Sequence, residues 1–351
     1  MAYVYAHGTG TPEDPYQVWT AEDLNGVREH LNAHFLQMAH IDLGGWGYWD
    51  PIGTGSHISA DIVPFTGGFN GGMYTISNLS INKSENSHIG FFAYIDHADS
   101  VIQRVTLNDA TVVGGSFSGI LVGSIQQGII EKCRVVGSSS ITAGNIVGGL
   151  VGTIGEHAQV ENCSAEANVA TVHDNGHTFG GFAGESDGVI TRCKSFGSVI
   201  GSSNGESVGG FIGLVQNGLV GECFSTGTVW GRSYVGSFTG GSMGNITDCY
   251  ATGDITITHG WSGGFAGYLY APATNSYFAG NIFNEGGEDN SVHGFAGESG
   301  ASDATTCFYD STVSGHSDTV GGATPKTTAE LKDQATFDGW DFETTWAIDS
   351  E

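Results

Sequence analysis

A short motif framed by glycine and other small residues returns along this chain at intervals of 27 to 32 residues. Each copy holds one large apolar residue, usually phenylalanine or leucine. Repeats of this length are typical of units that stack on one another, because one unit cannot bury its own apolar face. The copies are Gly90–Ala93 (degenerate), Ser118–Gly123, Gly148–Gly152, Gly180–Gly184, Gly209–Gly213, Gly236–Gly240, Gly263–Gly267 and Gly294–Gly297, with large residues Phe92, Leu121, Leu150, Phe182, Phe211, Phe238, Phe265 and Phe295.

Two further columns follow each copy in a fixed order. The second column comes 11 to 13 residues after the first and is mostly cysteine: Val105, Cys133, Cys163, Cys193, Cys223, Cys249, Ser276 and Cys307. The third column is β-branched: Val112, Ile141, Val169, Val199, Val229, Ile255, Ile282 and Val313. Three recurring columns predict an all-β chain, folded as a right-handed parallel β-helix (β-solenoid) of about eight three-sided coils.

The segments outside the repeat are predicted to be caps, because an open solenoid exposes an unpaired strand edge at each end. Residues 1–75 form the predicted N-terminal cap, in which a capping box at Thr20–Asp23 begins a helix over about 21–33, with strands after it. Residues 76–323 are the predicted solenoid. Residues 324–351 are the predicted C-terminal cap, with a short helix that begins near Thr327 and precedes several aromatic residues.

The charge of the chain excludes several classes of partner. Ten Lys and Arg stand against 37 Asp and Glu, a net charge of −27. Such a surface repels phosphate backbones and anionic lipids, so we expect no nucleic-acid partner. No stretch is long and apolar enough for membrane insertion. The first residues lack the basic region and apolar core of a signal peptide, so we expect no signal peptide in this chain.

The repeated elements resemble the GLUG repeat. Each Gly-Gly-Phe/Leu-x-Gly element is followed by a segment such as Val160–Cys163 or Ile246–Gly253, as in that family. The flanks, Gly10–Tyr16 and Thr336–Phe342 among them, are also similar to those of such proteins. The resemblance covers nearly the whole chain and implies bacterial surface or adhesin-like proteins and some phage-encoded ones. It implies no shared catalytic residues.

The cysteine column favours free thiols over disulfides. The six cysteines fall in a single column, with Ser276 in the position where one is missing. Stacked neighbours would have Cβ atoms near the strand spacing of about 4.8 Å, wider than the usual disulfide limit of about 4.5 Å. No pair of cysteines has the spacing of a structural zinc site, and the histidines are scattered. We therefore predict no metal site and no cofactor.

The residues that follow the cysteine column form the candidate binding site. If each cysteine points inward, the next residue points outward. The first four residues of this row are Thr106, Arg134, Ser164 and Lys194, and the last four are Phe224, Tyr250, Tyr277 and Phe308. A strip of rings can stack against the apolar faces of sugars or against a partner protein. The alternative is a stabilising ladder, covered by a loop or by an oligomer contact.

Candidate catalytic patterns are weak in this sequence. Two G-x-S-x-G segments, Gly184–Gly188 and Gly240–Gly244, lie in the same part of the repeat, which generates the pattern by itself. Glycoside hydrolysis needs two carboxylates about 5–10 Å apart, and Glu185 and Asp187 are the best placed among many loop acids. We assign no catalytic residues.

The sequence therefore predicts a non-enzymatic structural and adhesive β-solenoid. We expect it on a virion, as a tail fibre, spike or decoration protein, or on a bacterial cell surface. Its expected partners are a glycan or a cell-surface receptor, together with other virion or surface proteins, and an oligomer is compatible with the sequence. The alternative function is a polysaccharide-active enzyme, a glycoside hydrolase or lyase, on a β-helix scaffold.

Overall fold

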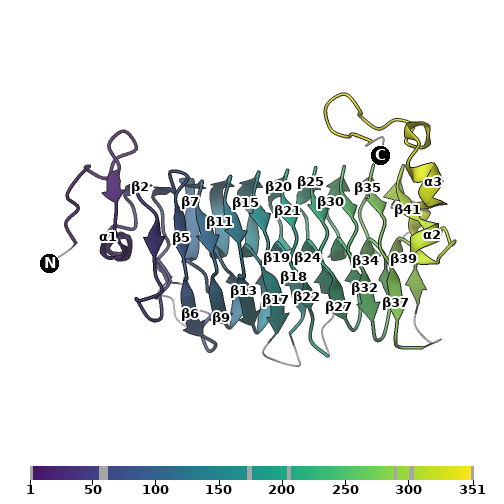
Figure 1. The fold of residues 1–351 in the computed structure, drawn as a ribbon, viewed down its shortest axis with the longest axis horizontal. Coiled ribbons are helices and arrows are strands. Elements are labelled where there is room, and N and C mark those ends of the chain that lie inside the picture. The colour runs from purple at the N-terminus through teal and green to yellow at the C-terminus, as the bar shows by residue number, and fades with distance from the viewer. Residues whose placement is uncertain are drawn as a thin grey trace.

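The computed structural model describes residues 3–54, 62–171, 176–203, 207–287, 291–299 and 304–348. Short strands stack along one axis into a rod, with the N-terminus at one end and the C-terminal segment at the other (Figure 1). All pairings between the named strands are parallel. The predicted all-β parallel β-solenoid is confirmed.

Each wall of the rod is a ladder of equivalent strands from successive coils. The main path of the sixteen-stranded sheet is β1 (Tyr16–Val18), β2 (His34–Gln37), β4 (Gly68–Asn70), β7 (Phe92–Gln103), β11 (Val122–Glu131), β15 (Val151–Glu161), β19 (Ala183–Ser186), β24 (Ile212–Val215), β29 (Thr239–Ser242), β34 (Ala266–Leu269) and β39 (Ala296–Ser299). Its branch is β20 (Val189–Thr191), β25 (Leu219–Gly221), β30 (Asn245–Thr247), β35 (Ala273–Thr274) and β40 (Ala304–Thr305).

The eleven-stranded sheet carries the candidate site. It consists of β3 (Ile41–Asp42), β5 (Thr75–Ser77), β8 (Thr106–Asn108), β12 (Arg134–Val136), β16 (Ser164–Ala165), β21 (Lys194–Ser195), β26 (Phe224–Ser225), β31 (Tyr250–Ala251), β36 (Tyr277–Phe278), β41 (Phe308–Asp310) and β42 (Thr324–Lys326).

Three smaller sheets complete the coils. The eight-stranded sheet is β6 (Ser80–Lys83), β9 (Thr111–Gly114), β13 (Ser140–Ala143), β17 (Asn168–Thr171), β22 (Val199–Ile200), β27 (Val229–Gly231), β32 (Ile255–Ile257) and β37 (Ile282–Asn284). The others are β10 (Ser116–Gly119), β14 (Asn145–Gly148), β18 (Thr178–Gly180), β23 (Ser207–Gly209) and β28 (Val235–Gly236), and the pair β33 (Ser262–Gly263) and β38 (Val292–His293). A central coil such as β18 to β22 thus has five short strands, more than the three columns predicted.

The sheets run through both segments that the sequence assigns to caps. Strands β1, β2 and β4 stack in register on β7, so no break in the sheet falls at residue 75. At the other end β42 pairs with β41. The helices are α1 (Ala21–Gly26), α2 (Ser311–Ser314) and α3 (Thr328–Leu331), and the 3₁₀ turns are Val27–Glu29, Val320–Gly322 and Gln334–Thr336.

The two predicted capping boxes are present, at Thr20 and at Thr327. The first helix is shorter than the range 21–33, because α1 and its 3₁₀ extension end at Glu29. The chain must then turn within four residues to begin β2, which pairs with β1 and β4. Strand pairing therefore decides where this helix stops.

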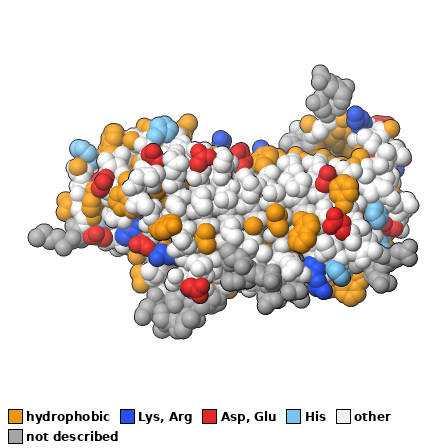
Figure 2. Space-filling model, turned by 60° about the horizontal axis from the view of Figure 1, so that its bottom comes forward, with side chains coloured by type: hydrophobic (Ala, Val, Ile, Leu, Met, Phe, Trp, Pro, Cys, Tyr) orange, Lys and Arg blue, Asp and Glu red, His pale blue; other side chains and the backbone are white. Residues whose placement is uncertain are grey.

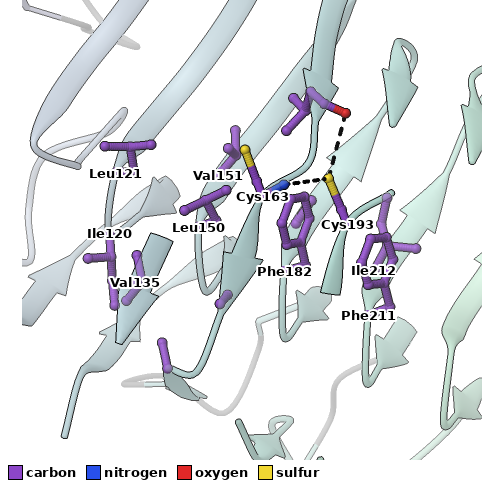
Figure 3. Close-up of a cluster of buried hydrophobic side chains, with 14 of the residues drawn as sticks. Ile120, Leu121, Val135, Leu150, Val151, Cys163, Phe182, Cys193, Phe211 and Ile212 are labelled. Atoms are coloured by element: carbon purple, nitrogen blue, oxygen red, sulfur yellow. Dashed lines mark hydrogen bonds between the residues drawn. The ribbon is translucent and has the colours of Figure 1, made fainter. Parts of the chain in front are cut away.

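The first column forms a stack of rings in the interior. Phe182, Phe211, Phe238, Phe265 and Phe295 lie with successive ring centroids 4.7–5.0 Å apart and nearly parallel planes. Figure 3 shows the column continuing through Leu150 and Leu121. The predicted first member of this column, Phe92, is wrong by one residue. Phe92 pairs with Val122, so Phe91 is the equivalent of Leu121.

The third column is confirmed from Val112 to Ile282 by the register of the eight-stranded sheet. Its predicted last member is wrong. Val313 lies in α2 and is 36% exposed, because the chain leaves the coil after β41 and begins a helix capped by the Asp310 side chain.

The glycines of the motif mark places where the backbone passes very close to itself. A Cβ on Gly180 would lie 2.0 Å from the carbonyl oxygen of Ala183, and one on Gly184 would lie 2.7 Å from that of Gly152. The obstacle is main chain in both cases, so no side chain can move aside. The repeat therefore requires glycine at these corners.

The cysteine column is buried, and all six cysteines are free thiols, as predicted. The Cys163 backbone N–H donates to Cys193 Sγ at 3.4 Å (Figure 3), and the N–H of Cys193 donates to Cys223 Sγ at 3.3 Å. Ser276 takes the same place, where its Oγ accepts from the Cys249 N–H at 3.2 Å. Burial raises the pKa of Cys307 to about 12.

Thiol labelling checks the cysteine ladder. Because all six thiols are buried, a thiol reagent cannot reach them, and the native protein is expected to react with almost none of it over minutes. All six should react at once in denaturant without a reductant. Fewer than six thiols in the denatured protein would mean that disulfides are present.

Candidate binding surface

The residues that follow the cysteine column form a row on the outside of the eleven-stranded sheet, hereafter the outer row. Strand register pairs its members in the predicted order, from Thr106 through Arg134 to Phe308. The residue before each member and the residue after it are buried, as Cys223 and Ser225 are on either side of Phe224. Alternation along the strand therefore turns the outer row outward.

Three rings of the outer row stack on one another. The centroids of Phe224 and Tyr250 are 4.7 Å apart with planes 12° from parallel, and those of Tyr250 and Tyr277 are 5.2 Å apart. Parallel pairing places equivalent side chains one strand spacing apart, which is about the distance at which rings stack. The row thus forms a continuous ladder of rings.

Residues 327–348, the C-terminal strap, cover much of this ladder. Figure 1 shows the strap turning back from the far end of the rod over the edge of the coils. Phe308 is only 9% exposed and packs in an aromatic cluster with Phe337 and Trp340. The Trp340 Nε1–H donates to the Thr306 carbonyl at 3.0 Å. Phe308 is therefore part of a small second core, and its predicted exposure is wrong.

The tip of the strap reaches the middle of the ladder. Trp346 lies 5.9 Å from Tyr277 and 6.1 Å from Tyr250, and its Nε1–H donates to Asp248 Oδ1 at 3.1 Å. Burial raises the pKa of Tyr277 beyond its ordinary range and that of Tyr250 less far. Of the four predicted binding residues, the strap thus leaves Phe224 and one side of Tyr250 accessible. Their part in binding stays a prediction.

A hollow of about 480 Å³ lies where the strap ends, lined by Phe224, Tyr250, Trp346, Arg192 and Lys194 among others. It continues toward the N-terminal end of the sheet as a second hollow of about 810 Å³, which we call the basic groove. Five of the ten Lys and Arg residues of the chain line this groove: Arg104, Lys132, Arg134, Arg192 and Lys194.

The basic groove is not evident in the sequence, because its five cations are spread over 91 positions, from 104 to 194. The pairing of successive strands in register brings these five cations together from two rows of residues, one on each side of the cysteine column. Arg134 and Lys194 belong to the outer row, whereas Arg104, Lys132 and Arg192 precede the cysteine column, each with a left-handed φ of 54–55°. Aligning the coils on the cysteine column and comparing both flanking positions would have revealed the cluster.

Two of these cations already have acidic partners. Arg192 Nη2 lies 2.6 Å from Glu161 Oε1, and its Nη1 lies 3.6 Å from Glu222. The hydrogen bond to Arg192 lowers the pKa of Glu161, and the same contact raises that of Arg192. Lys132 Nζ lies 3.3 Å from Glu131. These pairs are exposed to solvent, so each adds little to stability.

The other three cations have no such partner. Within the part of the chain that the structure describes, no carboxylate lies within 4.0 Å of the charged nitrogens of Arg104, Arg134 or Lys194. Lys194 Nζ instead lies over the ring of Phe224, 5.4 Å from its centroid. The groove thus offers free positive charge beside an accessible ring.

The described ranges contain no group of three His, Cys, Asp or Glu side chains that could hold a metal ion. In the same ranges, no helix combines the length and the apolar character needed to cross a membrane.

Fold and site together define a repetitive β-solenoid with one open, ring-lined and partly basic wall. A model of the GLUG motif matches residues 143–170 and 231–258. These matches confirm the resemblance found in the sequence: the chain contains GLUG motifs.

The chain is similar to known proteins in sequence and in fold. A protein of Evansella cellulosilytica described as a Gly-rich membrane protein is 32% identical over 99% of this chain and 45% of its own length. Halomucin of Haloquadratum walsbyi is 32% identical over 46% of this chain and 2% of its own length. The chain therefore spans less than half of either relative.

The solved structure is from Bacteroides ovatus and is described as an immunoglobulin A1 protease. It superposes with a TM-score of 0.56 over 96% of this chain and 91% of that chain, at 16% identity. At this identity the likeness concerns the fold alone.

Proposed function

We propose that this protein is a non-enzymatic structural and adhesive module of a cell surface, and that it binds glycan through the open part of its eleven-stranded sheet. The observation that carries the proposal is the accessible ring pair Phe224 and Tyr250 at the mouth of two connected hollows. Rings that stack on one another along a rigid sheet present a row of apolar ring edges with little conformational freedom to lose, which suits the apolar face of a sugar.

The setting at a cell surface is supported by the relatives. One is described as a membrane protein, and the other is halomucin, of which this chain matches only a small part. A repetitive rod that forms part of much longer chains suits a module that extends outward from a surface. Neither relative is described as a virion protein, so we favour the cell surface over the virion.

The absence of catalysis is supported by the environment of the candidate residues. Ser186 and Ser242 are completely buried, and the Ser242 hydroxyl donates to the Gly244 carbonyl within its own turn at 2.7 Å. Glu185 accepts from the Gln216 side chain at 2.7 Å, and Asp187 from that of Asn217 at 2.9 Å. The serines are thus buried in the coils, and the two carboxylates are occupied by contacts between coils rather than directed at a shared cleft.

A glycan array tests the function. The wild-type protein is expected to bind a subset of glycans, and Phe224→Ala should weaken that binding about 10-fold, since a stacked ring contributes about 1.4 kcal/mol. Phe283→Ala removes an exposed ring from another wall of the rod and should bind as wild type does. Equal binding by Phe224→Ala would contradict the assigned face. New reducing ends or unsaturated products would contradict the absence of catalysis.

A further inference from the structure

The basic groove stands out against the charge of the rest of the chain. It holds five of the ten cations, so the other five are spread over a surface that carries most of the 37 carboxylates. Figure 2 shows another face of the rod, on which the few Lys and Arg side chains lie among acidic ones on a largely uncharged surface. An anion approaching this protein is therefore repelled from most of it and attracted to one wall.

The cations of the groove are spaced along the rod in a pattern. Coils β12 and β21 each bring two cations, Lys132 with Arg134 and Arg192 with Lys194. The coil between them brings the uncharged polar residues Asn162 and Ser164. The two basic coils are two strand spacings apart, which is about 10 Å. That is close to the repeat of an extended polysaccharide that carries an acid on every second sugar.

The charge balance favours a ligand of low charge density. Glu131, Glu161 and Glu222 already engage Lys132 and Arg192 at the edge of the groove. A nucleic acid, with a phosphate at every residue, would meet these carboxylates along with the cations. A polysaccharide with alternate acids needs only the unpaired groups. Among the described residues, the cations without an acidic partner are Arg134 and Lys194, one on each basic coil, and Arg104. Arg104 lies one coil before Arg134, toward the N-terminus.

The end of the groove nearest the strap is aromatic. Phe196 is 41% exposed and meets the edge of Phe224 at a centroid distance of 5.6 Å. Lys194 lies over the Phe224 ring and Tyr250 stacks on that ring, so the groove presents a cation beside an apolar ring edge. An acidic sugar offers both complements, a carboxylate for the cation and an apolar ring face for the phenylalanine.

We propose that the basic groove binds an extended acidic polysaccharide with a carboxylate on alternate sugars, lying along the axis of the solenoid. Arg134 and Lys194 bind successive carboxylates, Asn162 and Ser164 bind the hydroxyl groups of the neutral sugar between them, and the exposed edge of Phe224 packs against a sugar ring. The inference rests on the proposed function and names the class of glycan.

The test uses the full chain and measures affinity by calorimetry. The probes are hyaluronan oligosaccharides, which carry carboxylates on alternate sugars, neutral N-acetylchitohexaose, heparin as the sulfated arm, and a single-stranded oligonucleotide. The double variant Arg134→Gln/Lys194→Gln is expected to bind hyaluronan about 10-fold more weakly or worse, because two charge-assisted contacts are lost. Its affinity should also depend less on salt.

The matched control is Arg232→Gln/Lys332→Gln, which removes the same charge outside the groove and should bind hyaluronan as wild type does. Arg134 and Lys194 are exposed, so their replacement leaves the core intact. If both double variants weakened hyaluronan binding equally, the groove would not be the binding site, because the affinity would then depend on net charge alone. Tighter binding of the oligonucleotide than of hyaluronan would overturn the ligand class, and tighter binding of heparin would overturn the preference for low charge density. Preference for N-acetylchitohexaose would overturn the acidic ligand while leaving glycan adhesion in place, whereas no binding of any saccharide would contradict the proposed function too.

Discussion

Gly209→Ala is expected to destabilise the solenoid by about 3 kcal/mol or more, at the upper end of what overpacking costs. The added Cβ would lie 2.0 Å from the carbonyl oxygen of Ile212 and 2.8 Å from the backbone nitrogen of Gly240. Ile212 cannot retreat, because β24 is paired on both sides, with β19 and with β29. The urea midpoint of unfolding measures the effect.

Gly45→Ala is the matched control for this substitution. No atom lies within 4 Å of a Cβ added there, and the backbone of Gly45 is not left-handed. The same one-methyl change should therefore alter the free energy of unfolding by no more than about 0.5 kcal/mol. Similar midpoints for the two variants would mean that the close approach of main chain at Gly209 is not what fixes glycine in the motif.

Phe211→Ala is expected to lower the free energy of unfolding by about 3–5 kcal/mol, the usual range for a buried phenylalanine. Its ring is completely buried and stacks between Phe182 at 4.9 Å and Phe238 at 5.0 Å. Removing it leaves a cavity that the neighbouring coils cannot fill, because their backbones are fixed by pairing on either side.

The comparison variant is Phe283→Ala, which removes a ring that is 51% exposed in β37. Its expected cost is well below that of Phe211→Ala, since most of the removed surface is already in contact with water. Thermal unfolding followed by circular dichroism distinguishes the two. A shift of the same size in both variants would contradict the burial of Phe211 within the interior stack of rings.

The sequence predicted the repeat unit well, for a physical reason. Parallel stacking places residue i of one coil against its equivalent in the next, so a column in the structure is also a column in the aligned sequence. The cysteine ladder and the outward register of Phe224 followed from this rule alone. The errors at Phe92 and Val313 arose at the ends of the sequence columns, where the first copy of the motif is degenerate and where the chain leaves the last coil for a helix.

The candidate site was predictable only in part. The order of the outer row could be derived from the alternation of side chains along a strand, and the structure has that order. The return of the C-terminal strap could not be derived, because it depends on contacts such as that of Trp346 with Asp248, 98 positions apart. No periodicity in the sequence records a contact of this kind.

The sequence by itself determined the architecture of this protein: a β-solenoid whose interior columns repeat because equivalent residues must pack on one another in every coil. The tertiary structure alone decided which part of its outer wall is open. Folding brings the strap over Tyr277 and Phe308, and it gathers Arg104, Arg134 and Lys194 into one groove. Both outcomes depend on the path of the chain in space, since packing and charge act between residues that are neighbours there and distant in the sequence.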